Sequence, residues 1–293
     1  MTALPRIAAL IGHGDELDML ERCIAHHARL GISHFLVSAD AGALRSPDEL
    51  AELEARENIR VLYRNENEDG FSFLTAARAV LAEWARPDWI VMLDSDEFCV
   101  CRSGDLRSAA DLAGADIVQL YRFNVPLVRR ADGSLRPLDL SGPGDVPLIR
   151  RPRHVDLHDL SETMWPPWIM AGLGARVMAR PDAVESVRTG GHTVVPRAGA
   201  SGSSFATDIC VLHVPFTTFE RFERKIERVR FAVESFGHLF KPHEALHWKR
   251  WAAIAQRGRL EVEFDRQILD EATFYALVAD GTIVIVEQYF AAP

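Results

Sequence analysis

Residues 88–98 read DWIVMLDSDEF, a stretch in which an apolar run is followed at once by carboxylates. The run over residues 89–93 has the composition of a short strand that is buried on both faces of a sheet. Asp94, Asp96 and Glu97 come directly after it. Because ligands of parallel α/β sheets bind at the carboxyl ends of the strands, this stretch predicts a central strand that ends in a binding site.

Strand and helix patterns alternate on the N-terminal side of this stretch. The strand patterns occupy residues 5–12, 34–40 and 59–65, and helix patterns fill residues 15–30 and 72–84 between them. Alternation of this kind is typical of an α/β fold with a mostly parallel sheet flanked by helices.

The second half of the chain is less regular. Residues 217–236 place apolar side chains at helical spacing, which predicts a helix. Further elements are expected as strands over 116–125, 175–181 and 282–290 and as helices over 243–256 and 265–279. We therefore expect a catalytic domain over residues 1–215 and a mainly helical extension over 216–293. The 217–236 helix is expected to pack on the catalytic domain, and the alternative is that it forms the seam of a homodimer.

Composition limits the partners of the chain. Its 293 residues are 48% hydrophobic, which suits an ordinary globular protein, and the formal net charge of -9 argues against nonspecific binding of nucleic acid. The four cysteines lack the spacing of a disulfide framework, so a cytoplasmic location is expected. The sequence contains no apolar stretch long enough for a transmembrane segment, and peripheral attachment to a membrane stays open.

The carboxylates after residue 93 favour a divalent metal. Because side chains alternate between the two faces of a strand, Asp94 and Asp96 are expected to point to the same side and Ser95 to the other. Two carboxylates about 4 Å apart repel by about 1 kcal/mol in water and by about 4 kcal/mol near a protein surface, so a cation is expected between them. Hard oxygen ligands favour Mg²⁺ or Mn²⁺, which commonly bind one or two carboxylates together with phosphate oxygens. The alternative is that these aspartates are the solvated start of a loop.

Three ordered segments resemble the family 2-like glycosyltransferases. They are ERCIAHHARLGISHFLVSAD over residues 21–40, DWIVMLDSDEF over 88–98, and LHVPFTTFERFERKI over 212–226. The resemblance, in the subgroup with a D-x-D-E-F motif, implies a GT-A (Rossmann-like) fold, a nucleotide-sugar donor with UDP-sugars favoured, and Mn²⁺ or Mg²⁺ as cofactor. It also implies a carbohydrate or lipid-linked acceptor.

The resemblance assigns roles to individual residues. It implies that Asp94, Asp96 and His213 hold the metal. Nucleotide-sugar contacts are expected from Gly12, Asp40, Asn65, Asp94, Ser95 and Asp96. The chain departs from the family pattern at residues 12–16, at 38–42 and at Thr217–Thr218, where the family commonly has arginine and serine.

Other candidate residues follow from chemistry. Trp165 and Trp168 would stack on acceptor sugars, or alternatively pin a loop to the core. An inverting transfer needs a carboxylate base, for which we name Glu97 and Asp208. Weaker candidates are Asp156, Asp159 and Glu162 for the base, His192 for the metal site, His26 and His27 for chemistry rather than packing, and Arg150, Arg151 and Arg153 for a charged ligand.

These inferences favour a metal-dependent glycosyltransferase that transfers a sugar with inversion. One alternative is a non-catalytic carbohydrate-binding or scaffold protein on the same fold. Another is a phosphatase whose first D-x-D aspartate is a nucleophile, but that motif normally opens the chain and continues differently.

Overall fold

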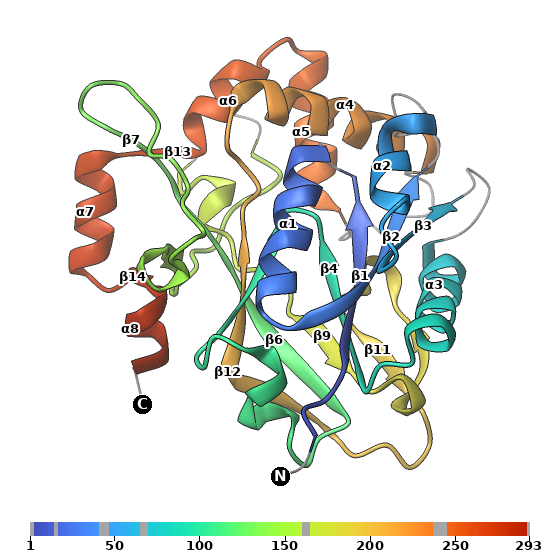
Figure 1. Cartoon of the computed structure of the whole chain (residues 1–293). Helices are drawn as coiled ribbons and strands as arrows, with labels where there is room; N and C mark the ends of the chain where they lie inside the picture. Colours follow the sequence, from blue (N-terminus) through green and yellow to red (C-terminus); the bar gives the residue numbers. More distant parts are fainter. Residues whose placement is uncertain are drawn as a thin grey trace. The chain divides into compact units, whose positions relative to one another are not determined.

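The computed structural model describes residues 3–14, 17–40, 47–64, 70–159, 165–236 and 245–291. Figure 1 shows the chain coloured along its sequence. Backbone contacts divide it into two compact units. The first unit consists of Met1–Arg122 and Gly174–His213, and the second consists of Phe123–Leu173 and Val214–Pro293. The expected boundary after residue 215 lies close to the last crossing, but the segment 123–173 groups with the C-terminal part.

An eight-stranded sheet forms the centre of the first unit, in the order β3-β2-β1-β4-β9-β6-β12-β5. Its strands are β1 Ile7–His13, β2 Ile32–Asp40, β3 Ile59–Arg64, β4 Trp89–Asp94, β5 Glu97–Cys101, β6 Ile117–Asn124, β9 Arg176–Ala179 and β12 Ser203–His213. The last two residues of β6 belong to the second unit. Strands β3, β2, β1 and β4 are parallel, while β9 is antiparallel to both β4 and β6. Because β6 therefore runs with β4, the expected α/β fold with a mostly parallel sheet is confirmed.

Helices cover the parallel part of the sheet. They are α1 Leu17–Arg29, α2 Ala51–Glu54 and α3 Gly70–Ala85. On one face, Ala77 and Leu81 of α3 pack with Leu10, Leu36 and Met92 from the strands. Ile7, Ala9 and Ile11 of β1 are also buried, so both faces of this strand are covered, which explains its apolar run over residues 7–11.

The sheet cannot be flat, because β4 and β5 are neighbours in sequence but not in the sheet. Three strands separate them, although only Ser95 and Asp96 connect them. Three residue steps reach at most about 11 Å, whereas four strand spacings in a flat sheet span about 19 Å. The sheet must therefore curl, so that the start of β5 returns to the end of β4 at the turn that carries the D-x-D aspartates.

The second unit contains helices and two short strand pairs. β7 Leu127–Arg129 runs parallel to β13 Ile268–Asp270, and β8 Pro147–Ile149 runs antiparallel to β14 Ile283–Ile285. Its helices are α4 Phe219–Phe236, α5 Leu246–Gln256, α6 Leu260–Arg266, α7 Glu271–Ala279 and α8 Val286–Ala291. Both strand pairs join the segment 123–173 to the C-terminal segment, which explains why these distant parts form one unit.

Two predicted elements of the C-terminal segment are corrected. The predicted helix over 265–279 is interrupted by β13, after which Asp270 caps α7 by accepting a hydrogen bond from the Thr273 N–H. The predicted strand over 282–290 is limited to β14 and is followed by α8. Apolar runs this short do not distinguish a strand from a buried helix by pattern alone.

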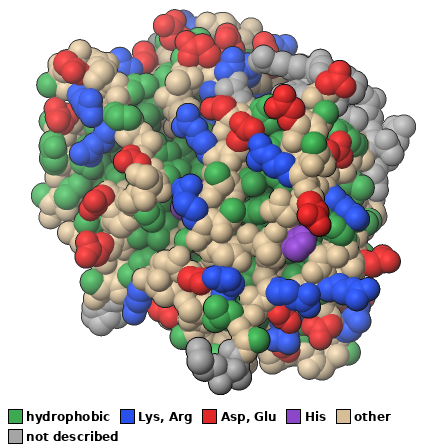
Figure 2. Space-filling model, viewed as in Figure 1, with side chains coloured by type: hydrophobic (Ala, Val, Ile, Leu, Met, Phe, Trp, Pro, Cys, Tyr) green, Lys and Arg blue, Asp and Glu red, His purple; other side chains and the backbone are tan. Residues whose placement is uncertain are grey.

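The described parts of the chain contain no helix with the length and hydropathy needed to cross a bilayer. The face shown in Figure 2 carries Lys and Arg side chains interspersed with Asp and Glu, and it presents no broad basic surface. This distribution agrees with the net charge of -9.

Candidate functional site

The DSDEF segment forms a tight turn between two strands of the first unit. β4 ends at Asp94 and β5 begins at Glu97, so Ser95 and Asp96 occupy the turn itself. The Ser95 N–H donates to the Gly12 carbonyl at 3.0 Å. The expectation that strand alternation places Asp94 and Asp96 on one side is therefore wrong in its reason, because the strand stops between them.

Gly12 lets Asp94 approach β1 closely. A Cβ atom at position 12 would lie 3.1 Å from the Asp94 Oδ1 atom. Gly12 is also paired with both Ser38 and Asp94 in the parallel sheet. The predicted nucleotide contact at Asp40 lies at the end of β2 on this same edge, although only its backbone is described. Asn65 lies outside the described residues.

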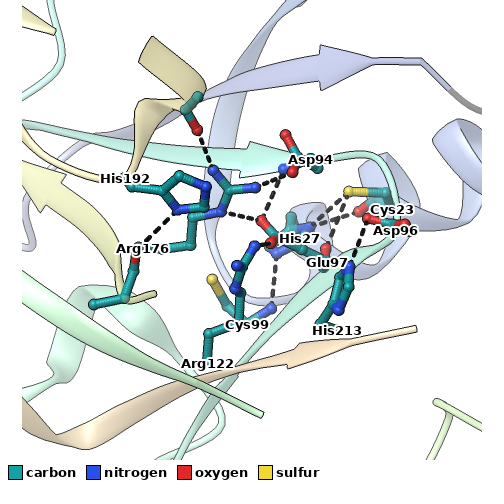
Figure 3. A network of polar contacts seen from close by, with 12 residues as sticks. Cys23, His27, Asp94, Asp96, Glu97, Cys99, Arg122, Arg176, His192 and His213 are labelled. Atoms are coloured by element: carbon teal, nitrogen blue, oxygen red, sulfur yellow. Dashed lines mark hydrogen bonds and ion pairs between the residues drawn. The ribbon is translucent and has the colours of Figure 1, made fainter. Parts of the chain in front are cut away.

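Glu97 lies at the centre of an arginine–carboxylate network, defined as Asp94, Glu97, Arg122 and Arg176 (Figure 3). Its side chain is 0% exposed and accepts from Arg122 at 2.6 Å and from Arg176 at 2.5 Å. Its Oε2 atom also accepts from the Asp94 N–H at 2.8 Å. Although burial by itself raises the pKa of Glu97, the guanidinium groups of Arg176 and Arg122 hold it down at about 2. This geometry favours a positioning role for Glu97 over the expected role of catalytic base.

Arg176 links Glu97 to the more exposed Asp94. The Arg176 guanidinium donates to Asp94 and to the Gly190 carbonyl, while the Asp94 side chain is 49% exposed. Desolvation raises the pKa of Asp94 to about 6, Arg176 opposes this rise, and Glu97 and Asp96 add to it. Asp94 is thus an oriented carboxylate with one side open to a ligand.

Asp96 and His213 form the second pair of the site. The Asp96 Oδ1 and His213 Nε2 atoms lie 3.7 Å apart, and both side chains are buried. Strand pairing explains their meeting, because His213 at the end of β12 is opposite Glu97 at the start of β5. Metal–ligand bonds of about 2.1 Å would allow both atoms to bind one ion.

The Asp96–His213 pair is suited to a divalent cation whose remaining coordination positions are filled by a bound ligand. An oxygen donor and an imidazole nitrogen suit Mn²⁺, and such ions commonly keep positions for phosphate oxygens and water. Within the described ranges, no group of three or more His, Cys, Asp or Glu side chains could hold a metal ion by itself.

His192 lies beside the arginine–carboxylate network on the loop between β10 Val184–Val187 and β11 Val194–Pro196 (Figure 3). Gly190 and Gly191 adopt φ values of 76° and 66°, which allow the loop to turn back toward Arg176. His192 donates from Nδ1 to the Ala175 carbonyl at 3.2 Å. Burial, followed by Arg176 and Arg122, lowers its pKa to about 4, so its imidazole is neutral at pH 7.

Asp208 lies away from this site. It pairs with Arg102 at 3.4 Å and accepts from the Ala110 N–H at 3.3 Å. Its neighbour Ile209 is opposite Cys101, at the other end of β5 from Glu97. Five residue steps along β12 lead from Asp208 to His213, or about 16 Å along a strand. The expectation that Asp208 acts in the same site is therefore corrected.

The histidine pair of α1 has a packing role. His26 donates from Nε2 to the Cys99 carbonyl at 2.7 Å, and His27 accepts from the Cys99 N–H at 3.0 Å. His27 also donates from Nδ1 to the Cys23 carbonyl at 2.8 Å. The two rings therefore satisfy both backbone groups of Cys99 on β5, the last strand of the sheet.

Arg122 and Arg176 are site residues that the sequence analysis missed. Each lies within an apolar strand, in the segments YRFN and ARVMA, where an isolated arginine resembles an outward-facing surface residue. A signal exists for Arg176, because every residue of its strand β9 is buried and a buried arginine needs a carboxylate partner.

The two predicted acceptor tryptophans differ in exposure. In the second unit, Trp168 is 5% exposed and packs edge-to-face against Phe216 and Trp251, whereas Trp165 is 63% exposed. Trp168 is therefore a core residue, and only Trp165 presents its ring to a ligand.

Comparison with known proteins gives distant structural similarities. No protein-family model matches the chain, and no curated protein matches it in sequence. TarS 1–349 from S. aureus is 13% identical over 89% of this chain and 71% of that chain, with a TM-score of 0.39. The same protein in complex with UDP-GlcNAc is 13% identical over 89% and 73% of the two chains, with a TM-score of 0.40.

A third similar structure is GalNAc-T7 with UDP, GalNAc and Mn²⁺. It is 12% identical over 96% of this chain, with a TM-score of 0.39, and the match spans 57% of that protein. At these identities and TM-scores, the similarities do not assign a function. The first unit is an α/β domain with an oriented carboxylate, Asp94, and a carboxylate–histidine pair, Asp96 and His213, at the strand ends. These residues, and not the similarities, indicate a function.

Proposed function

We propose that the chain is a metal-dependent glycosyltransferase of the GT-A type, which transfers a sugar from a nucleoside-diphosphate donor to a hydroxyl acceptor. The observation that carries the proposal is the meeting of Asp96 and His213 at 3.7 Å beside the oriented Asp94. These residues come from the separate segments 88–98 and 212–226, which resemble glycosyltransferase motifs.

In this proposal, Asp96 and His213 hold Mn²⁺ or Mg²⁺. Asp94, which was expected as a third metal ligand, pairs with Arg176 and is assigned to the donor instead. When bound, the ion supplies positive charge that stabilises the departing diphosphate. The positive charges of Arg122 and Arg176 balance the negative charges of Asp94 and Glu97. These four side chains therefore add little net charge to a site that binds a cation and a diphosphate.

The remaining residues of the site position the donor. Asp94 is held from behind by Arg176 and accepts hydrogen bonds from donor hydroxyl groups on its exposed side. Gly12 leaves room for this carboxylate, and we propose that Asp40 and Asn65 contact the nucleotide. We assign the base of an inverting transfer to neither Glu97 nor Asp208, because the first is enclosed by arginines and the second lies at the other end of β12.

The acceptor in this proposal is a carbohydrate or a lipid-linked hydroxyl compound, and the chain works in the cytoplasm. The four cysteines are free and buried in the structure, as expected for thiols that take no part in disulfides.

Calorimetric titration of UDP and of GDP, with Mn²⁺ and with EDTA, tests this function. We expect UDP to bind in the presence of Mn²⁺ and to bind at least about tenfold more weakly after chelation, because diphosphate binding needs the cation. Asp96→Asn and His213→Gln should each reduce the metal-dependent binding by a similar factor.

The matched control is Asp208→Asn, which alters a carboxylate of the same strand as His213 but away from the site. It should leave UDP binding unchanged. A folded wild-type protein that binds neither nucleotide with Mn²⁺ would contradict the proposal and favour a non-catalytic carbohydrate-binding protein.

A further inference from the structure

The second unit contains a cavity of about 320 Å³ that the donor chemistry does not use. Its lining residues are Arg153, His154, Trp165, Pro166, Met170 and Leu277. Small-molecule sites are mostly apolar cavities of about 300–1,000 Å³ with a few polar groups, so this volume suits a ligand of one ring rather than a nucleotide.

Trp165 gives the cavity an aromatic wall. Its side chain is 63% exposed, although the indole is a large apolar group. The faces of aromatic rings pack well against the C–H faces of sugar rings, while the indole N–H can donate to a hydroxyl. The exposed tryptophan therefore favours a flat, hydroxyl-bearing ligand.

The backbone that follows Trp165 is held in place by buried polar side chains. The Ile169 N–H donates to Gln267 Oε1 at 2.9 Å, and its carbonyl accepts from Asn124 Nδ2 at 2.8 Å. Both amide side chains are buried, and Trp168 packs into the core beside them. The cavity wall is thus fixed before a ligand arrives, which lowers the entropic cost of binding.

Arg153 supplies the polar side of the cavity. Its Nη2 atom donates to Thr282 Oγ1 at 3.1 Å and lies 3.4 Å from an Asp280 oxygen. Because Asp280 balances its charge, Arg153 is better suited to donate to neutral hydroxyl groups than to hold an anion. A guanidinium has five N–H donors in a fixed plane, so some can point to a ligand while Nη2 is anchored.

We propose that this cavity binds one uncharged sugar ring, which stacks on Trp165 and receives hydrogen bonds from Arg153. The inference rests on the proposed function in one respect, namely that the ring is part of the acceptor. The acceptor would then be a neutral carbohydrate. Trp165 would contact its ring, whereas Trp168 would support the cavity wall from the core.

Saturation-transfer difference NMR on the full chain tests the cavity, with the methyl glycosides of glucose, galactose and N-acetylglucosamine as probes. At least one probe should give a saturable signal without nucleotide or metal. Trp165→Ala should weaken its binding by roughly tenfold, because it removes the stacking surface. Arg153→Gln should weaken it while leaving the tryptophan in place.

Tyr275→Ala is the matched control, because Tyr275 is an aromatic residue of α7 with 56% exposure and is not among the described lining residues. It should leave the signal unchanged. No signal with any probe, or equal losses in Trp165→Ala and Tyr275→Ala with all proteins folded, would overturn the inference.

Parallel titration of UDP with Mn²⁺ on the same samples separates the two proposals. Nucleotide binding without probe binding would reject the cavity alone. Probe binding without nucleotide binding would keep the sugar site and reject the transferase.

Discussion

Arg176 is a buried cation that joins three segments of the first unit. Its guanidinium contacts Asp94 at the end of β4, Glu97 at the start of β5 and the Gly190 carbonyl of the β10–β11 loop. A buried charge costs several kcal/mol of desolvation unless its partners are well placed, so the position of this arginine depends on both carboxylates. The pairing with Arg176 therefore sets the direction in which the exposed side of the Asp94 carboxylate points.

Glu97→Gln should destabilise the protein by about 3–5 kcal/mol. The substitution preserves the shape of the side chain but removes its negative charge. Arg122 and Arg176 then lose the carboxylate that they share, and their buried guanidinium charges are less well balanced. The free energy of unfolding in urea measures the effect.

Asp265→Asn is the control for this substitution, because it breaks the exposed pair between Asp265 and Arg129. Exposed ion pairs contribute about 0–1 kcal/mol, so its loss should be small. Equal losses in the two variants would contradict a special role for the buried network.

At the scale of elements, α1 and β5 are joined by side chains that take the place of a neighbouring strand. His26 and His27 satisfy the carbonyl and the N–H of Cys99, and the Cys23 thiol donates to the Glu97 carbonyl at 3.4 Å. Since β5 starts at the D-x-D turn, this contact also fixes one end of the candidate site.

The α1–β5 contact predicts a stability that falls with acidification. Burial, with a smaller contribution from His26, lowers the pKa of His27 from 6.5 to about 3, against opposing effects of the Cys23 carbonyl and Glu97. Between these pH values the unfolded chain binds one more proton at this residue than the folded chain does. The contribution of His27 to stability is therefore complete above about pH 6.5 and decreases by about 1.4 kcal/mol per pH unit toward pH 3.

Urea unfolding between pH 7 and pH 4 measures this slope in the wild type and in His27→Gln. In the variant, the slope of the unfolding free energy against pH should be smaller by about 1.4 kcal/mol per pH unit, which corresponds to one proton. Arg22→Ala, on the exposed side of α1, controls for a general effect on the helix. A slope that is the same in wild type and His27→Gln would exclude this account.

The sequence predicted the elements near the motif better than their connections. The strand before Asp94, the alternating helices and the sheet class followed from local patterns that persist in the structure. The turn at Ser95–Asp96 and the pairing of His213 with Glu97 depend on strand order, which no local pattern encodes. Arg122 and Arg176 escaped notice because an arginine has a defined role in a strand only once its carboxylate partner is known.

At the scale of the whole molecule, the two units interleave along the chain, which crosses between them after residues 122, 173 and 213. The core of the second unit combines Val128 and Ile149 from the middle segment with Trp251 and Phe264 from the C-terminal segment. Neither segment contains this core by itself.

A fragment of residues 1–215, the predicted catalytic domain, should therefore fail to fold completely. It lacks β13 and β14 and the apolar side chains that cover the 123–173 segment. Limited proteolysis should cleave the fragment within residues 123–173 under conditions in which the full chain is protected there. A fragment that resists cleavage like the full chain would show that the two units are separable at residue 215.

The late position of β12 has a consequence for synthesis on the ribosome. β5 is made by residue 101, but its sheet partner is completed only at residue 213, more than a hundred residues later. During that interval the hydrogen-bonding groups that β12 will occupy are open to other nascent or newly released chains. The imidazoles of α1 are already available to cover the opposite edge of β5, so they would leave only one side of the waiting strand exposed to mispairing.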